Sequence, residues 1–274
     1  MFCRNILIRR NLAISRSISC FNRSIPNFTR TSISGSTHSS LSSIRTLLTS
    51  TRTPSRARIT RSPSTYISSM PLVTISQSLD ESYTKHKIVP DVIDKFDTEG
   101  LLTIEYNDEQ VALGNTLKVS KTQNKPEIQF TLNSSNIEGE TITIGSEDKF
   151  ILVLTDPDAP SNSDHKWSEY AHWIISDLTF DGPEFESLTH KINYSKGNEI
   201  LSYQGPAPPP NTGKHRYVFL LYKQDPKGKV KTPSDRPNWG TGIAGSGVRD
   251  WIKQNLPGLK LLGVNFFYAQ NEEN

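Results

Sequence analysis

The sequence has little cysteine, and what it has lies near the N-terminus. Cys3 and Cys20 are the only cysteines among 274 residues, so residues 70–274 contain none. That part of the chain therefore has no disulfide, no cysteine nucleophile and no cysteine ligand for zinc. No apolar run approaches the roughly 20 residues of a membrane-spanning helix, and no internal repeat is evident.

Acidic residues and lysine are both absent from the first 79 residues. This segment carries eleven arginines, and the first acidic residue of the chain is Asp80. Residues 80–274 hold 20 basic and 28 acidic residues, a formal charge of −8, so the overall charge of +3 averages two opposite parts. Binding to a phosphate backbone needs clustered positive charge. No nucleic acid is therefore expected as a partner of the acidic part.

Residues 1–69 combine arginine, serine and spaced apolar residues, a composition typical of a mitochondrial transit peptide. The alternative is a disordered leader without a function. Composition turns ordinary at Met70, so we expect a disordered basic leader over 1–69 and a folded domain over 70–274, long enough to bury a core. Translation would start at Met1 or Met70. A form starting at Met70 is expected in the cytoplasm or the vacuole, and the full-length form in mitochondria.

Strand signals dominate the 70–274 segment. Spaced apolar residues over 76–96, interrupted by Pro90, predict two short helices. Residues 247–256 predict one amphipathic helix. Runs of β-branched and aromatic residues predict strands over 101–106, 127–132, 141–144, 150–155, 172–178, 215–223 and 259–269. Many strands with few helices between them favour an antiparallel β-sandwich or barrel over a doubly wound α/β sheet.

Two carboxylates follow the apolar run FILVLT at 150–155. Asp156 and Asp158 flank Pro157, and Pro160 comes two residues later. Because prolines stiffen the turn, this rim should hold both carboxylates at a sheet edge. A strand-ending turn with hydrated aspartates is the plainer interpretation.

Two histidines begin two further apolar strands, at His172 and His215, and the loop GPAPPP at 205–210 lies between them. Alone, such a histidine is more often a hydrogen-bonded structural residue than a ligand-binding one. The proline-rich loop alone is typical of a connector or of a polyproline ligand for another protein. Together these elements predict a small preformed polar pocket. Protonated histidine and loop N–H groups would receive a phosphate or carboxylate there. A nearby aspartate would favour the imidazolium.

Four motifs resemble the phosphatidylethanolamine-binding protein family: DPDAPS at 156–161, HKWSEYAHW at 165–173, GPAPP at 205–209 and GKHRYVFLLYKQ at 213–224. DHKWSEY at 164–170, the region 236–245 and NFFYA at 265–269 are most similar to the fungal branch of carboxypeptidase Y inhibitors. The resemblance implies a mainly β fold, namely a two-sheet antiparallel β-sandwich with a few peripheral helices and an anion pocket.

The same resemblance implies the pocket residues. Motif by motif, the ligand-binding residues would be Asp156, Asp158, Pro160, Trp167, Tyr170, His172, Gly205, Ala207, Pro208, His215 and Tyr217. No catalytic residue, metal ligand or cofactor is expected. Tyr170 and Ala171 stand where many relatives have Trp and His, and Pro210-Asn211 where a Lys-Gly pair is common, so head-group preference should differ. Since the chain ends soon after Tyr268, the mouth should be more open than in animal relatives, which add a helix.

The function implied is that of a non-catalytic regulatory protein. It would inhibit a serine carboxypeptidase of the carboxypeptidase Y type, modulate signalling proteins, and bind a phosphate-bearing small molecule or a phospholipid head group. One alternative is a metal-dependent hydrolase using Asp156, Asp158, His172 and His215, although neither G-x-S-x-G nor H-E-x-x-H occurs. The other is a subunit associated with mitochondrial ribosomes, which the leader suggests.

Overall fold

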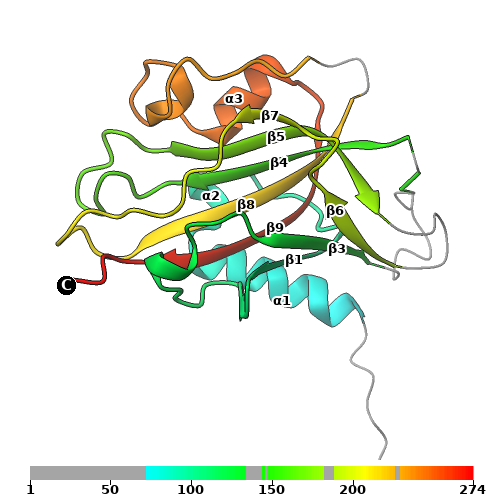
Figure 1. The fold of residues 1–274 in the computed structure, drawn as a ribbon, viewed down its shortest axis with the longest axis horizontal. Coiled ribbons are helices and arrows are strands. Elements are labelled where there is room, and N and C mark those ends of the chain that lie inside the picture. Colours follow the sequence, from blue (N-terminus) through cyan, green and yellow to red (C-terminus); the bar gives the residue numbers. More distant parts are fainter. Residues whose placement is uncertain (1–71, 134–143, 146, 182–187, 226–228, 274) are drawn as a thin grey trace, which may run out of the picture. The chain divides into compact units, whose positions relative to one another are not determined.

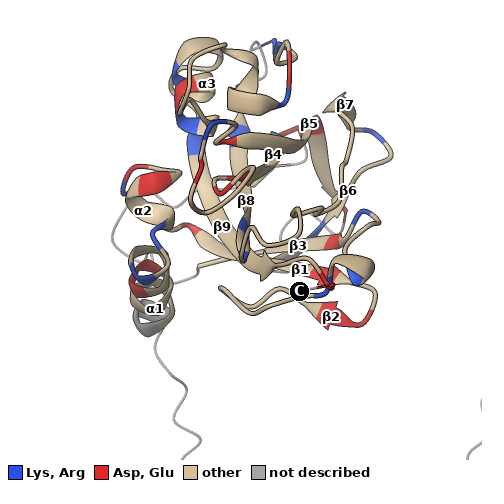
Figure 2. Cartoon of the chain, turned by 90° about the vertical axis from the view of Figure 1, so that its left-hand side faces the viewer, with Lys and Arg blue, Asp and Glu red and all other residues tan. Residues whose placement is uncertain are grey.

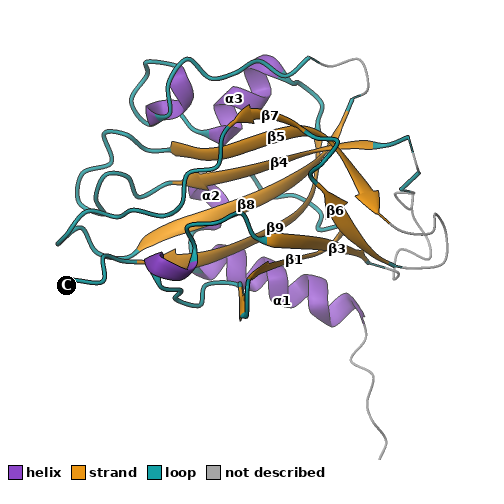
Figure 3. Cartoon of the chain, viewed as in Figure 1, coloured by secondary structure: helices purple, strands orange, loops and turns teal. Residues whose placement is uncertain are grey.

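Strands dominate the part of the chain that the computed structural model describes, which comprises residues 72–133, 144–145, 147–181, 188–225 and 229–273 (Figure 1). The strands are β1 Gly100–Tyr106, β2 Glu109–Gln110, β3 Glu127–Leu132, β4 Lys149–Asp156, β5 Tyr170–Asp181, β6 Thr189–Asn193, β7 Asn198–Leu201, β8 His215–Gln224 and β9 Lys260–Ala269. The helices are α1 Leu72–Lys85, α2 Ile88–Asp91 and α3 Val248–Asn255, with short 3-10 turns η1 Val119–Lys121 and η2 Pro237–Gly240 (Figure 3).

The strands form one curled antiparallel sheet. Their order is β2-β1-β3-β6-β5-β4-β8-β9, and β7 pairs with β5 off this path. Strand β5 belongs to both halves of the sheet, since its first part pairs with β4 and β7 and its last three residues, 179–181, pair with β6. The mainly β fold with peripheral helices is confirmed. The expected two-sheet sandwich is not, because β5 runs through both halves.

Strand β4 shows how a continuous apolar run becomes a strand buried on both faces. Phe150, Leu152 and Leu154 belong to the core enclosed by the curled sheet. Ile151 and Val153 point the other way, into a second core that includes buried side chains of α1 and α3. Neither face of the strand meets water, so its sequence shows no polar alternation.

Most of the predicted elements are confirmed, with three differences. The two N-terminal helices separate at Lys87, which has φ 55°, rather than at Pro90, which lies within α2. Strands β2, β6 and β7 were not predicted, because they are short and rich in polar residues. The prediction for 141–144 falls almost entirely outside the described residues, as does the whole leader.

Charges of both signs alternate on the helices outside the sheet (Figure 2). Helix α1 carries Asp80, Glu81 and Lys85, and α3 carries Arg249, Asp250 and Lys253. These helices therefore present mixed charge rather than a basic face. In the described ranges, none of the helices has both the length and the apolar character needed to cross a bilayer.

Candidate functional site

A cavity of about 140 Å³ opens where β4 ends and where β5 and β8 begin. The antiparallel register brings these ends together, since Asp156 pairs with Tyr170 and Thr155 pairs with Val218. The volume equals that of a few water molecules and is below that of a typical pocket for a drug-sized ligand. The lining residues are Asp156, Ala159, Pro160, Trp167, Tyr170, His172, Gln204, Ala207, Pro208, Pro209, His215 and Tyr217.

Nine of the eleven predicted pocket residues line this cavity, and two do not. Asp158 is turned to Arg216, and Gly205 packs against Gln123, whose Oε1 would lie 2.7 Å from an added Cβ. Sequence reasoning missed Ala159, Gln204 and Pro209. All three are immediate neighbours of predicted residues, so adjacency to the motifs was the only signal available. That the lining binds a ligand stays a prediction.

The deepest polar pair in the cavity is Asp156 with His215. The two side chains are almost completely buried, and His215 Nδ1 lies 2.8 Å from Asp156 Oδ2. Asp156 Oδ1 accepts the backbone N–H of Asp158 at 2.8 Å. On the far side of the ring, His215 Nε2 lies 3.0 Å from Thr212 Oγ1. Both ring nitrogens of His215 therefore have partners inside the protein.

His172 is held from one side only. Its Nδ1 lies 2.8 Å from the carbonyl oxygen of Gln204, so Nδ1 must carry the hydrogen. Burial lowers the pKa of His172 below its ordinary value, although Asp156 acts in the opposite direction. Asp156 favours the imidazolium of His172, as expected, but the loss of hydration on burial outweighs the carboxylate and lowers the pKa. Neutral His172 presents Nε2 as an unprotonated acceptor.

Asp158 ties the rim of the cavity to the N-terminal helices through Arg216. Its carboxylate accepts the Arg216 backbone N–H at 2.7 Å and two guanidinium N–H groups at 3.0 and 2.8 Å. Arg216 Nη1 also donates to the carbonyl oxygens of His86 and Lys87 and to Asp91 Oδ2. Asp158 thus supports the cavity from behind rather than facing a ligand.

A buried carboxyl group that was not predicted lies next to the cavity wall. Glu169 is 5% exposed, and burial raises its pKa to about 8. Its Oε2 lies 2.9 Å from Thr155 Oγ1, which also receives the indole N–H of Trp239 at 3.1 Å and lies 3.3 Å from the carbonyl oxygen of Tyr170. Thr155 donates its hydroxyl hydrogen to Glu169 Oε2, and the backbone N–H of Val248 donates a second hydrogen bond to the same carboxyl group. No local pattern signals this network.

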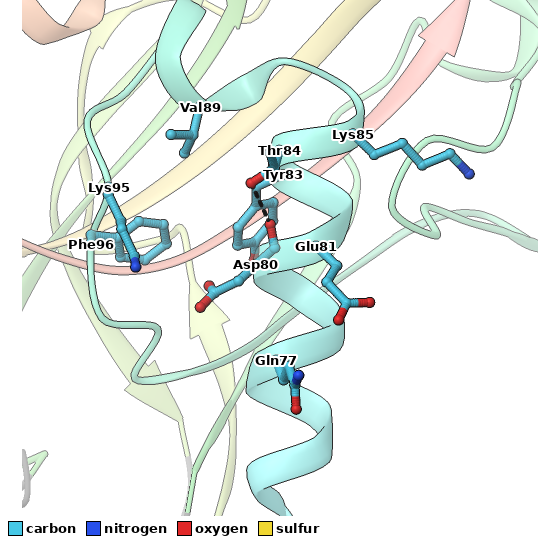
Figure 4. Close-up of a pocket in the computed structure, with 9 residues that line it drawn as sticks. All are labelled: Gln77, Asp80, Glu81, Tyr83, Thr84, Lys85, Val89, Lys95 and Phe96. Atoms are coloured by element: carbon cyan, nitrogen blue, oxygen red, sulfur yellow. Dashed lines mark hydrogen bonds between the residues drawn. The ribbon is translucent and has the colours of Figure 1, made fainter.

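A larger hollow of about 540 Å³ runs beside α1 (Figure 4). Its lining comprises Gln77, Asp80, Glu81, Tyr83, Thr84, Lys85, Val89, Lys95 and Phe96. Figure 4 shows Lys85 and Glu81 on the outer side of α1, whereas Asp80 points toward Lys95 on the opposite side of the helix. The smaller cavity gathers the buried titratable side chains of Asp156, His172 and His215, so it is the better candidate for a functional site.

The metal-hydrolase alternative finds no support in the side-chain geometry. Within the described ranges, no group of three or more His, Cys, Asp or Glu side chains is placed to hold a metal ion. Of the four residues that it required, Asp158 is committed to Arg216 and both nitrogens of His215 have partners.

The protein is of the mainly β class, with a curled antiparallel sheet, peripheral helices and a small polar cavity at the ends of its strands. The family model for phosphatidylethanolamine-binding protein matches residues 107–267. The chain belongs to the phosphatidylethanolamine-binding protein family.

Individual members of this family and one solved structure are similar to the chain over most of their length. The chain is 42% identical to the carboxypeptidase Y inhibitor of Saccharomyces cerevisiae over 220 residues, which cover 73% of this chain and 98% of that protein. A crystal structure of carboxypeptidase Y inhibitor complexed with its cognate proteinase aligns with TM-score 0.65 over 72% of this chain and 97% of that one. Protein FLOWERING LOCUS T of Arabidopsis thaliana is 34% identical over 158 residues, covering 57% of this chain and 75% of that protein.

Proposed function

We propose that this chain is a non-catalytic inhibitor of a serine carboxypeptidase of the carboxypeptidase Y type. One observation carries the proposal: 42% identity extends over 98% of the length of a carboxypeptidase Y inhibitor. A solved neighbour with the same level of identity is in complex with its proteinase, which supports a proteinase as the partner.

Titration of carboxypeptidase Y with the purified chain tests this proposal. Protease–inhibitor pairs are among the tighter protein complexes, so half-inhibition is expected between about 1 nM and 1 µM, or about −12 to −8 kcal/mol of binding free energy. The readout is hydrolysis of a short peptide at its C-terminus. Unchanged hydrolysis at an inhibitor concentration well above that range would remove the proposal.

We propose as a second function that the cavity binds a small oxyanion, either a phosphate-bearing small molecule or a phospholipid head group. Its support is the convergence of nine predicted residues on one small polar cavity. Calorimetric titration with inorganic phosphate should show binding that His215→Ala weakens, because the variant leaves Asp156 buried without its partner. Glycerophosphoethanolamine in a parallel titration distinguishes a head group from free phosphate. Equal affinity of wild type and variant would exclude the cavity.

A further inference from the structure

The loop between β4 and β5, residues 157–168, folds back on itself around His165. His165 Nδ1 lies 3.0 Å from the carbonyl oxygen of Pro157, and Nε2 lies 3.0 Å from the carbonyl oxygen of Asn162. The imidazole therefore bridges the start of the loop and its middle. Ser168 closes the end of the loop, since its Oγ donates to the carbonyl oxygen of Pro157 at 2.7 Å and its N–H donates to that of His165 at 2.9 Å.

Both partners of the His165 ring can only accept a hydrogen bond. A neutral imidazole carries a hydrogen on one nitrogen only, so it would direct the lone pair of the other nitrogen at a carbonyl oxygen. An imidazolium donates from both nitrogens and satisfies both carbonyl groups. His86 differs in this respect, because its Nδ1 lies 2.9 Å from the hydroxyl of Tyr268, which can donate or accept. Only the bridge made by His165 therefore requires a second proton.

The bridge also fastens the loop to the chain that enters β8. Asn162, whose carbonyl oxygen receives His165, donates its N–H to the carbonyl oxygen of Thr212 at 3.3 Å. Its Nδ2 donates to the carbonyl oxygen of Lys214 at 2.8 Å. Gly213 permits this close approach, because an added Cβ would lie 2.8 Å from Asn162 Nδ2. A ring that holds Asn162 thus holds two separate loops together.

The other end of the loop has an anchor that needs no proton. Asn238 donates its N–H to the carbonyl oxygen of Trp167 at 3.1 Å and its Nδ2 to that of Lys166 at 3.0 Å. The indole of Trp167 is 42% exposed, with Lys166 Nζ 5.5 Å from its ring centroid. The charge of His165 therefore decides whether this exposed tryptophan is held from one side or from both.

Charged side chains near His165 have partners of their own. They come from the loop, the end of β4, the approach to β8 and the residue before η2: Asp164, Lys166, Asp156, Asp158, Lys214 and Arg236. Asp164 and Lys166 pair at 3.7 Å, and Lys214 Nζ lies 3.2 Å from a threonine hydroxyl. Carboxyl, ammonium and guanidinium groups ordinarily keep their charge between pH 5 and 8. His165 is exposed to solvent, so its ring can exchange a proton in that range.

We propose that the 157–168 loop is a pH-sensitive clasp, in which protonation of His165 adds the second hydrogen bond, fixes the loop to the chain before β8 and holds Trp167 in place. Its stabilisation is present when the imidazole is charged and is lost when the proton leaves. The clasp therefore tightens as pH falls through the range from 8 to 5 and loosens as pH rises. This inference is independent of carboxypeptidase inhibition and of oxyanion binding.

Amide hydrogen exchange of the full chain, followed by NMR at pH 5.5 and pH 8, tests the inference. Protection factors remove the pH dependence of the exchange chemistry, and the amides of Asn162 and Ser168 report on the clasp. Their protection should be roughly three- to tenfold higher at pH 5.5, the range expected from one hydrogen bond. Amides of β8 in the same spectra report global opening and separate it from opening of the loop.

Two variants identify the group responsible. His165→Gln has no titratable ring, so the ratio of protection factors at Asn162 and Ser168 between the two pH values should fall to about one. His86→Gln is the matched control and should keep the ratio of the unaltered protein, because the partner of His86 suits either protonation state.

Two results would overturn the clasp. One is protection of Asn162 and Ser168 in the unaltered protein that does not change between the two pH values, or changes only in step with the amides of β8. The other is a pH dependence that persists in His165→Gln. The first comparison uses only the unaltered protein, so it decides the matter even if a variant fails to fold.

Discussion

At the scale of single residues, burial decides the chemistry more than sequence neighbours do. The motif DPDAP places Asp156 and Asp158 two residues apart, yet one faces the cavity and the other binds Arg216. Most of the cavity lining was predictable because whole motifs converge on it. The different roles of the two aspartates, the tautomer of His172 and the burial of Glu169 were not, since each depends on a partner distant in sequence or on exclusion of water.

Glu169 should make the free energy of unfolding depend on pH. Its pKa is raised from 4.5 to about 8 in the folded chain, so folding retains a proton that the unfolded chain loses. Stability is then highest below about pH 4.5 for this group and declines as pH rises toward 8. Urea denaturation at pH 7 and pH 9 should show that Glu169→Gln is more stable than wild type at pH 9, by on the order of 1–4 kcal/mol.

Exposed Glu81→Gln serves as the matched control for Glu169→Gln and should follow the wild-type pH profile. The lowered pKa of His172, His86 and His190 places the effects of these groups at acid pH, outside the window of pH 7 to 9. Parallel profiles for wild type and Glu169→Gln would show that Glu169 is ionised in the fold.

Removal of Arg216 should destabilise the fold strongly. Arg216→Met leaves Asp158, 4% exposed, without its cation. Breaking such a pair from one side costs about 3–5 kcal/mol, which urea denaturation can measure. The double variant Asp158→Asn/Arg216→Met removes the orphaned charge and should recover part of the loss. A single variant as stable as wild type would mean that water reaches Asp158.

At the scale of elements, the sequence predicts long apolar strands well and short polar ones poorly. Strands β4, β8 and β9 were found because their residues are buried on one or both faces. Strands β6 and β7 hold fewer buried residues, and pairing with β5 rather than their own composition makes them strands. Helix α1 ends at Lys85, two residues before Lys87, which has a left-handed backbone conformation. Lysine has no preference for that conformation, so the sequence does not predict the end of the helix.

The core between the sheet and helices α1 and α3 should contribute as much to the free energy of unfolding as the core enclosed by the curled sheet. Ile151 of β4 is fully buried on the face of the sheet that the helices cover. Ile151→Ala should cost about 2–5 kcal/mol, through lost burial and the cavity left behind. Ile243→Ala, at a side chain that is 62% exposed, should change stability by less than about 0.5 kcal/mol. Equal midpoints of urea unfolding for the two variants would show that packing between the helices and this face of the sheet contributes little to stability.

At the scale of the whole molecule, charge divides the sequence into a basic leader and an acidic remainder. This charge division is read directly from the sequence, and the runs of β-branched and aromatic residues predicted the mainly β class. The join between the two halves of the sheet was not predictable, because it depends on how far β5 extends past β4 and bends toward β6.

Carboxypeptidase inhibition should differ between forms starting at Met1 and at Met70. If inhibition needs a free N-terminal segment ahead of α1, the 69 residues before Met70 would obstruct it. The shorter form should then inhibit at least several-fold more strongly in the same peptide assay. A third form, with a Gly/Ser segment of equal length in place of the leader, separates obstruction from the charge of eleven arginines. Equal inhibition by all three forms would show that the N-terminus takes no part.

Strand β5 has a consequence for how the molecule opens. Because its amide groups are shared between the two halves of the ladder, and both halves enclose the same aromatic interior, neither half can separate without exposing the other. The slowest-exchanging amide protons in β3 and β8 should therefore lose protection together, as one cooperative unit, when denaturant is raised.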